Sequence, residues 1–232
     1  MNDEPRSYVV AGQHAWSRAA FDDHIAGLPG RWTFIGEAGE LTADKLAELQ
    51  PRYVFFLHWS TRVPEAIVAE YECVCFHMTD VPFGRGGSPL QNLILAGHTS
   101  TQLTALRMVE AFDAGPVYYK VPLPLDGSAQ EIYGRAMRVA ATLIERFVAE
   151  QPTPVPQQGE ATVFRRRKPA DSELPERASA AQLYDFIRML DAEGYPHAFV
   201  RHGALRLEFR DAVLRDGFVE ARAIIRTEGD QP

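Results

Sequence analysis

A continuous apolar run at residues 53–57, Tyr-Val-Phe-Phe-Leu, most constrains how this chain can fold. An apolar run of strand length is typical of a β-strand that is covered on both faces, as in a parallel sheet. Strand-like runs at residues 8–12, 32–35 and 73–76 alternate with segments of helical spacing. This alternation predicts an α/β domain with a mostly parallel sheet.

The rest of the chain predicts a long helix and a small C-terminal part. Residues 129–149 have an amphipathic pattern that completes a first domain at residues 1–150. We expect a linker at residues 151–177, which opens with several prolines, and then a small α+β subdomain at residues 178–232. Further helices are expected at residues 17–28, 42–50 (with Thr42 as N-cap), 65–69, 89–97 and 178–192, and further strands at residues 103–109, 117–121, 198–200, 205–209 and 219–225.

Charge and composition exclude some classes of function. A formal net charge of −7 argues against sequence-independent binding of nucleic acid, which needs a basic surface. The short basic run at residues 165–168 is interpreted as a solvated loop. The chain has no apolar run long enough to span a membrane and no signal-peptide layout. Its two cysteines are too close for an ordinary disulfide, so we expect a reducing, cytoplasmic location.

Polar residues of catalytic type cluster between residues 75 and 120. His77 follows a strand-like run, a glycine-rich loop comes next, and Asp113 stands before a Gly-Pro turn. An imidazole can act as general acid or base, and a carboxylate can orient it. Each residue also has a structural interpretation, His77 as a buried strand residue and Asp113 as a turn residue. No metal is expected, because Cys73, Cys75 and His77 have no fourth ligand at metal-site spacing.

Several classes of enzyme have no support in the sequence. Gly12 is not followed by the glycine spacing of a dinucleotide-binding loop. The chain also contains neither a nucleophile-elbow motif nor a Walker loop. Hydride transfer, serine hydrolysis and P-loop phosphoryl transfer are therefore not expected.

The same block matches one family pattern without a gap. The matching positions are His77, Pro82, Gly86, Pro89, Gln91, Thr101, Thr104, Val109, Glu110, Asp113 and Gly115. This pattern resembles the folate-dependent formyltransferase family, and the loop at residues 76–92 looks like that of its nucleotide-sugar N-formyltransferases. The resemblance implies a Rossmann-like catalytic domain.

It also implies transfer of a formyl group from 10-formyltetrahydrofolate to a primary amine. His77 would be the general base or proton shuttle, and Asp113 would orient it. Arg85, Gly86 and Gly87 would meet the amine substrate. The implied folate-binding residues are Trp59, Ser60, Arg62, Val63, Asp80, Val81, Pro82, Val109, Glu110, Ala111 and Phe112.

One position departs from the family pattern. The asparagine that in the family binds the formyl oxygen is replaced here by Cys75. A thiol is a weak hydrogen-bond donor, so another group would have to help stabilise the oxyanion. We hypothesise that His58 supplies part of this help. Ser60 or a backbone N–H of the loop at residues 79–87 are alternatives.

The identity of the amine is left open by the sequence. An acidic chain with a short tail argues against a tRNA acceptor, and residues 12–15 lack the phosphate loop of the glycinamide ribonucleotide enzymes. We expect a nucleotide-linked amino sugar, such as a 4-amino-4,6-dideoxysugar of surface-polysaccharide or nonulosonic acid biosynthesis. The alternatives are a free amine or natural-product intermediate, or a non-catalytic homologue that binds folate or a partner. The C-terminal subdomain is expected to pack on the first domain or to form a homodimer contact.

Overall fold

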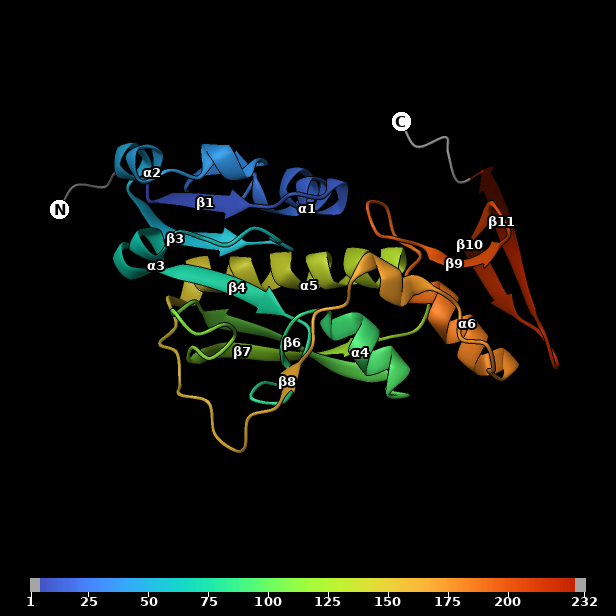
Figure 1. Cartoon of the computed structure of the whole chain (residues 1–232). Helices are drawn as coiled ribbons and strands as arrows, with labels where there is room; N and C mark the ends of the chain where they lie inside the picture. The colour runs from blue at the N-terminus through green and yellow to red at the C-terminus, as the bar shows by residue number, and fades with distance from the viewer. Residues whose placement is uncertain (1–4, 228–232) are drawn as a thin grey trace. The chain divides into compact units, whose positions relative to one another are not determined.

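The computed structural model describes residues 5–227 (Figure 1). The chain divides into two compact units. The first unit comprises the residues up to Gly86, Thr101–Leu123 and Tyr133–Val163. The second comprises Gly87–Ser100, Pro124–Ile132 and the residues from Phe164 on. The boundaries expected at residues 150 and 178 stay a prediction.

The first unit is built on a mixed, mostly parallel sheet. Its strand order is β2-β1-β3-β4-β6-β7. β1 pairs in parallel with β2 and β3, β3 pairs in parallel with β4, and β4 pairs antiparallel with β6. The predicted α/β class is therefore confirmed. The strands are β1 (Ser7–Ala11), β2 (Arg31–Ile35), β3 (Pro51–Phe56), β4 (Cys73–His77), β6 (Ser100–Arg107) and β7 (Val117–Pro124).

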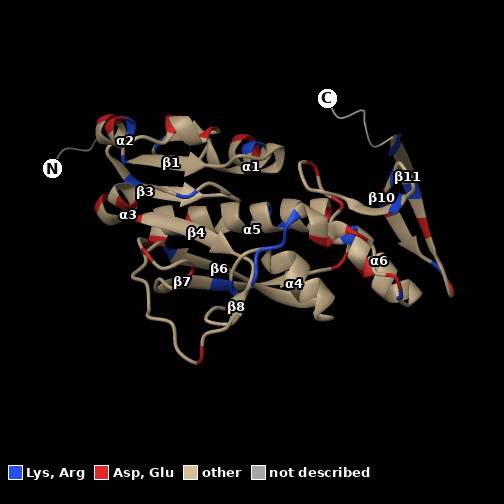
Figure 2. Cartoon of the chain, viewed as in Figure 1, with Lys and Arg blue, Asp and Glu red and all other residues tan. Residues whose placement is uncertain are grey.

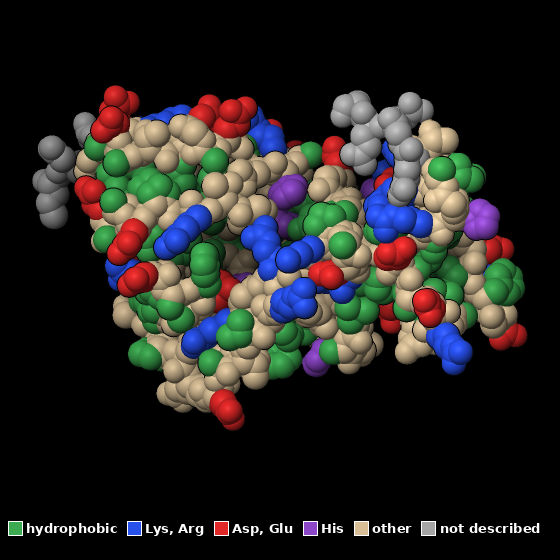
Figure 3. Space-filling view, in the orientation of Figure 1, with side chains coloured by type: hydrophobic (Ala, Val, Ile, Leu, Met, Phe, Trp, Pro, Cys, Tyr) green, Lys and Arg blue, Asp and Glu red, His purple; other side chains and the backbone are tan. Residues whose placement is uncertain are grey.

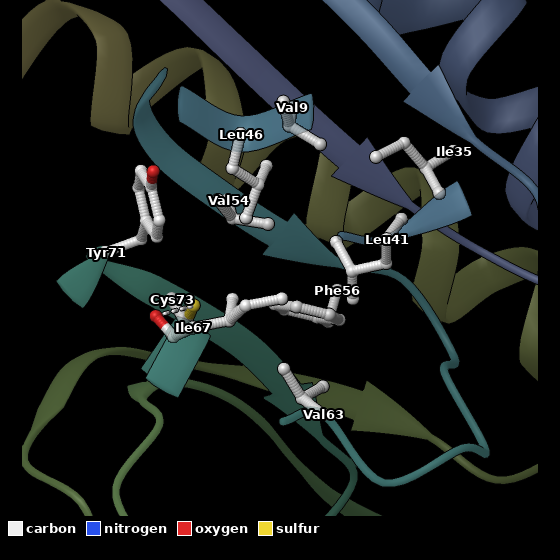
Figure 4. Packing of buried hydrophobic residues seen from close by; sticks show 11 residues of the cluster. Val9, Ile35, Leu41, Leu46, Val54, Phe56, Val63, Ile67, Tyr71 and Cys73 are labelled. Atoms are coloured by element: carbon white, nitrogen blue, oxygen red, sulfur yellow. Dashed lines mark hydrogen bonds between the residues drawn. The ribbon is translucent and has the colours of Figure 1, made fainter. Parts of the chain in front are cut away.

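The apolar run at residues 53–57 forms most of β3, and both faces of this strand are covered. On one face, Tyr53 and Phe55 each place their rings 5.3 Å from the ring of Phe147 in α5 (Ala129–Glu150). On the other face, Val54 and Phe56 belong to a buried cluster (Figure 4). Successive side chains of a strand point to opposite faces, so a strand that is covered on both sides needs no polar positions.

The cluster in Figure 4 joins the sheet to the helices on that second face. Leu46 comes from α2 (Ala43–Leu49) and Ile67 from α3 (Glu65–Glu70). The predicted cap of α2 is confirmed, because the Thr42 hydroxyl accepts a hydrogen bond from the Lys45 N–H at 3.2 Å. Partly buried side chains that pack against the cluster are Leu49, Trp59, Val68, Cys75 and Met108.

Two sequence-based expectations for the first unit need correction. The helix expected at residues 17–28 begins earlier as α1 (Ala15–Ala20) and continues as a π-helical turn, Phe21–Ile25. The Ala26 N–H bonds to the Phe21 carbonyl there, which widens the turn while Phe21 and Ile25 stay buried. The strand expected at residues 117–121 is longer, because β7 runs to Pro124 and includes Pro122. β7 is the edge strand, where a missing N–H removes no bond to a neighbour.

The second unit has its own small sheet and two helices. Three antiparallel strands lie in the order β11-β10-β9. Ser179 and Gln182 form a reciprocal capping box at the start of α6, which is shorter than expected. The α+β character expected of this part is confirmed. Its elements are α4 (Pro89–Leu95), a 3₁₀ turn (Pro169–Ser172), α6 (Ala180–Arg188), β9 (Ala198–His202), β10 (Leu205–Leu214) and β11 (Val219–Thr227).

Among residues 5–227, no helix is long and apolar enough to cross a membrane. The remaining elements are a 3₁₀ turn (Ala38–Glu40) and a two-stranded ribbon of β5 (Arg85–Gly86) and β8 (Val163–Phe164).

Gly115 provides a test of this packing. A Cβ atom at Gly115 would lie 1.8 Å from the backbone carbonyl oxygen of Arg107, which cannot move without disturbing the end of β6. We expect Gly115→Ala to lower the free energy of unfolding by roughly 2–4 kcal/mol. Gly134→Ala is the control, because a Cβ at that position within α5 would make only an ordinary 3.7 Å contact with Arg138 Nη1 and should be neutral or stabilising by up to about 1 kcal/mol. Urea unfolding of both variants makes the comparison, and equal stabilities would contradict the packing described.

Candidate active site

His77 lies at the carboxyl end of β4, and both of its ring nitrogens face oxygen atoms. Nε2 is 2.8 Å from the carbonyl oxygen of Gly84, and Nδ1 is 3.5 Å from Oδ1 of Asp113. A carbonyl oxygen only accepts, so Nε2 carries a proton. Nδ1 therefore faces the carboxylate of Asp113. His77 is 8% exposed, so its imidazole is largely shielded from bulk water.

Asp113 is held by contacts to its side chain and to its backbone. Oδ2 accepts a hydrogen bond from the Gly86 N–H at 2.9 Å. The backbone of Asp113 is left-handed, with φ 53°, which Asp tolerates better than most residues. The Gln157 amide donates to the carbonyl oxygens of Asp113 and Gly115, both at 2.8 Å. Arg85 in turn donates to Gln157 Oε1 at 2.8 and 3.2 Å. The carboxylate therefore has a fixed position.

The loop after β4 is tied down along its length. The Thr104 hydroxyl donates to the Thr79 carbonyl at 2.6 Å, and the Thr101 hydroxyl donates to the Met78 carbonyl at 3.1 Å. Lys120 forms an ion pair with Asp80, with Nζ 2.5 Å from Oδ1. These bonds give the two threonines of the sequence pattern a structural role. They keep the segment that carries Gly84 and Gly86 in place beside the catalytic candidates.

A cavity of about 70 Å³ lies in the first unit beside Asp113. Its walls combine apolar side chains with a few charged ones, which is the usual composition of a small-molecule site. Val63, Val68, Cys75 and Met108 belong to or pack against the core cluster, so the apolar wall is anchored in the core. The lining residues are Arg62, Val63, Glu65, Val68, Cys75, Leu106, Met108, Val109, Glu110, Phe112 and Asp113.

The structure gathers seven of the sequence-predicted site residues around this cavity. They are Arg62, Val63, Cys75, Val109, Glu110, Phe112 and Asp113. Four lining residues were missed, namely Glu65, Val68, Leu106 and Met108. Leu106 and Met108 had been assigned to an ordinary strand, and their alternating positions before Val109 were the available signal. Other predicted residues do not line the cavity: His58, Trp59, Ser60, His77, Asp80, Val81, Pro82, Arg85, Gly86, Gly87 and Ala111.

Several of those residues have structural contacts instead. Val81 is fully buried, and the Pro82 carbonyl accepts a hydrogen bond from the Thr162 N–H at 3.1 Å. The Ser60 N–H donates to the Gln13 side chain at 2.9 Å. Trp59 is different, because its indole N–H is buried without a hydrogen-bond partner among the residues described. Their functional roles stay predictions.

Cys75 presents a protonated thiol to the cavity. Burial, together with the nearby Asp113 carboxylate, raises the pKa of this thiol well above its usual range. A thiolate would face an uncompensated negative neighbour, so nucleophilic chemistry at Cys75 is disfavoured. Its partner Cys73 lies in the core cluster, where burial raises the thiol pKa to about 12.

His58 lies in an aromatic cluster. The Trp16 indole N–H donates to His58 Nδ1 at 3.3 Å, and the ring centroids of His58 and Tyr133 are 4.4 Å apart. An imidazole that accepts from an indole is neutral. Burial, followed by the neighbouring His14, lowers the pKa of His58 to about 3. The role of oxyanion donor that we hypothesised for His58 stays a prediction, and these contacts do not direct the ring to the cavity.

Comparison with known proteins gives the family. The family model of the methionyl-tRNA formyltransferase C-terminal domain matches residues 169–226. The structure of methionyl-tRNA formyltransferase from Clostridium thermocellum is 39% identical in sequence, with a TM-score of 0.91. The match covers 96% of this chain and 99% of that one. The chain therefore belongs to the formyltransferase family, whose members use formyl-tetrahydrofolate, and it is an N-formyltransferase.

More distant structures share the fold. HypX from Aquifex aeolicus in complex with tetrahydrofolic acid is 16% identical with a TM-score of 0.73, and the match covers 89% of this chain and 37% of that one. A sugar N-formyltransferase from Shewanella sp is 14% identical with a TM-score of 0.65, and the match covers 88% and 96% of the two chains. At these identities the likeness concerns the fold alone.

Gln157 gives a test of how Asp113 is positioned. Gln157→Leu removes the amide that donates to the carbonyls of Asp113 and Gly115, and Gln157→Glu keeps only an acceptor for Arg85. We expect both variants to lower kcat for formyl transfer about tenfold with little change in KM, because a displaced catalytic group costs rate more than binding. Gln158→Leu, at an exposed neighbour, is the control. Unchanged kcat in both Gln157 variants would contradict this role.

The lowered pKa of His58 predicts a pH dependence of stability. The folded state keeps His58 neutral down to about pH 3, whereas in the unfolded chain the imidazole has its ordinary pKa of about 6.5. Stability from this group is complete above pH 6.5 and is lost as the pH falls toward 3, by at most about 1.4 kcal/mol per pH unit. His58→Asn, which tolerates the left-handed backbone there and does not titrate, should show a shallower slope in urea unfolding between pH 4 and 7. Equal pH dependence of the unfolding free energy in the wild type and His58→Asn would contradict the lowered pKa of His58.

Proposed function

We propose that this enzyme transfers a formyl group from 10-formyltetrahydrofolate to the primary amine of a nucleotide-linked amino sugar. A 4-amino-4,6-dideoxysugar is the acceptor to assay first. The observation that carries the proposed chemistry is the carboxylate of Asp113. Asp113 lines a partly apolar cavity, its carboxylate contacts His77 and the Gly86 N–H, and its backbone carbonyl accepts a hydrogen bond from Gln157.

The lining residues have the chemistry that one part of a folate needs, and at about 70 Å³ the cavity holds only part of such a ligand. A pterin is a flat ring system with polar edges, and the cavity offers apolar walls from Val63, Leu106 and Met108 with the charged groups of Arg62 and Glu110. When bound, 10-formyltetrahydrofolate supplies the formyl carbon that the amine nitrogen attacks, and the folate nitrogen that is released ends with a proton.

Asp113 is the group that takes the proton of the attacking amine in this proposal. Asp113 lines the cavity, whereas His77 is not among its lining residues. Nδ1 of His77, which faces Oδ1 at 3.5 Å, can receive the proton that Asp113 takes, and the imidazolium so formed then stabilises the carboxylate. The roles therefore differ from the sequence-based expectation. In this proposal Asp113 takes the proton from the substrate amine, and His77 positions Asp113. A general base of this kind contributes on the order of 10²–10⁴ in rate.

The oxyanion needs donors that line the cavity. Among its lining side chains, the donors are the Arg62 guanidinium and the Cys75 thiol. The backbone N–H groups of residues 83–86 already donate inside the protein. We therefore assign Arg62 the main part of oxyanion stabilisation and Cys75 a weak part. Unchanged turnover in Arg62→Ala would remove Arg62 from this role.

The net charge of the chain and its similarity to a known relative bear on the identity of the acceptor. The net charge of −7 disfavours a long polyanionic acceptor. The 39% identical relative carries the name of a tRNA enzyme, so an aminoacylated tRNA is the second candidate. These two acceptors differ so strongly in size and charge that a direct assay separates them.

An acceptor panel tests the proposal. The purified enzyme is given 10-formyltetrahydrofolate with UDP- and dTDP-linked 4-amino-4,6-dideoxysugars, lysine, ornithine and methionyl-tRNA. We expect formylation of an amino sugar nucleotide at the highest kcat/KM, and a loss of about 10²–10⁴ in Asp113→Asn. Glu48→Gln removes an exposed carboxylate of α2 and serves as the control. Faster formylation of methionyl-tRNA or of a free amine would refute the sugar acceptor, and full activity of Asp113→Asn would refute the proposed base.

A further inference from the structure

Four consecutive cations, residues 165–168, form a basic segment directly after β8 in the second unit (Figure 2). Figure 3 shows Lys and Arg side chains gathered on the face drawn. Arg165, Arg166 and Lys168 are exposed, and Arg167 is half-buried. A concentrated positive charge is unexpected on a chain with a net charge of −7. The basic segment has no role in the chemistry proposed for Asp113 and His77.

The basic segment borders a hollow of about 340 Å³. The hollow is lined by Asn92, Arg165, Arg166, Arg167 and Asp171. Every lining side chain is polar or charged, and three of the five carry guanidinium groups. Guanidinium groups bind phosphate oxygens in pairs through parallel N–H donors.

The backbone of the basic segment is held in place. Asn92 Nδ2 lies 3.2 Å from the Arg165 carbonyl oxygen, and the Arg167 N–H donates to the Ser88 hydroxyl at 3.0 Å. Gly87 lies directly against Arg166, because a Cβ there would come within 2.5 Å of the Arg166 Cβ. The segment therefore has a preorganised backbone, which lowers the entropic cost of binding a ligand.

The positive charge is not neutralised within the protein. None of the four side chains forms an ion pair with a carboxylate among residues 5–227. Asp171 is the one acidic residue that lines the hollow, and it accepts a hydrogen bond from the Lys168 N–H at 2.7 Å. That bond, with the nearby cations, holds the pKa of Asp171 below its usual range. Four positive charges and one negative charge leave about three in excess.

Arg167 also lacks a partner for one of its donors. Its Nε is buried and has no hydrogen-bond partner in the described part of the chain, although an Nη group donates to the Asp171 carbonyl. The guanidinium lies 5.5 Å from the centroid of the Phe186 ring, which fixes its plane. A buried N–H without an acceptor is unfavourable, and an anion in the hollow would relieve the excess charge around it.

We propose that this hollow binds the phosphate groups of a nucleoside diphosphate. The diphosphate of an amino sugar nucleotide carries two negative charges and a free nucleoside diphosphate nearly three, so either ligand opposes the excess of about three positive charges. A compact hollow on an acidic chain suits a small phosphate ligand better than the extended backbone of a nucleic acid. The nucleotide identity rests on the proposed amino sugar nucleotide acceptor, whereas the phosphate site rests on the geometry of the hollow.

Isothermal titration of the full chain tests this site, with UDP, dTDP, inorganic pyrophosphate and uridine as separate ligands. We expect binding of the first three, weakened by added salt, and none of uridine. Arg165→Ala with Arg166→Ala should weaken the Kd for pyrophosphate and both nucleotides at least about tenfold, since each charged hydrogen bond is worth that much. Arg177→Ala with Arg215→Ala, two exposed arginines of the same unit, removes the same charge and should change Kd less than about twofold.

Three results would overturn the site. They are no binding of pyrophosphate or nucleotide by the wild type, equal weakening in both double variants, or arginine-dependent binding of tRNA without binding of the diphosphates. Arg165→Gln with Arg166→Gln repeats the test if the alanine variant unfolds. The titration needs neither formyl donor nor amine. Its failure is therefore distinguishable from failure of the amino sugar acceptor, which the acceptor panel measures separately.

Discussion

The proposed chemistry depends on how the carboxylate of Asp113 is held. One oxygen faces His77 at 3.5 Å, and the other accepts from the Gly86 N–H at 2.9 Å. The left-handed backbone of this residue is secured by Gln157, which bonds to the carbonyls on both sides of Ala114. Three separate stretches of sequence thus hold Asp113, two through its carboxylate and one through its backbone. A carboxylate held this way is preorganised to receive a proton, and the protein need not reorganise during the reaction.

The cavity wall depends on the core behind it. Val63 lies in the buried cluster of Figure 4 and also lines the cavity, while Cys75 and Met108 pack against that cluster. Truncating a large buried aliphatic residue costs about 2–5 kcal/mol. Changes in the cluster should therefore disturb the cavity as well as the stability. The replacement of the family's asparagine by Cys75 suits this apolar wall, and it leaves Arg62 as the strong donor at the cavity.

Periodicity predicted the parts of the structure that depend on local pattern. The apolar run in β3 and the N-cap at Thr42 could be predicted from the sequence, because each follows from side-chain chemistry within a few residues. The spacing match to a known family also brought Cys75 and Asp113 into one site, and the structure places both at the cavity. What could not be predicted depends on distant contacts. Gln157 lay in an expected linker, and nothing in its neighbours indicates its bonds to residues more than 40 positions away.

The prolines of β7 and the basic segment are two further features that depend on distant contacts and could not be predicted from local sequence. Proline ends a strand unless the strand lies at a sheet edge, and edge position is a property of the whole sheet. Residues 165–168 were interpreted as a solvated loop, because a charge run alone does not reveal a hollow formed with Asn92 and Asp171. In both cases the information lies in tertiary structure.

The central claim is that Asp113 meets the substrate and that His77 acts through it. A double-mutant cycle on kcat/KM with His77→Gln, Asp113→Asn and the double variant tests this most directly. If His77 works only through the carboxylate, the double variant should be within about threefold of Asp113→Asn alone. Losses that multiply across the two substitutions would show that His77 contributes independently of Asp113, and would contradict the account.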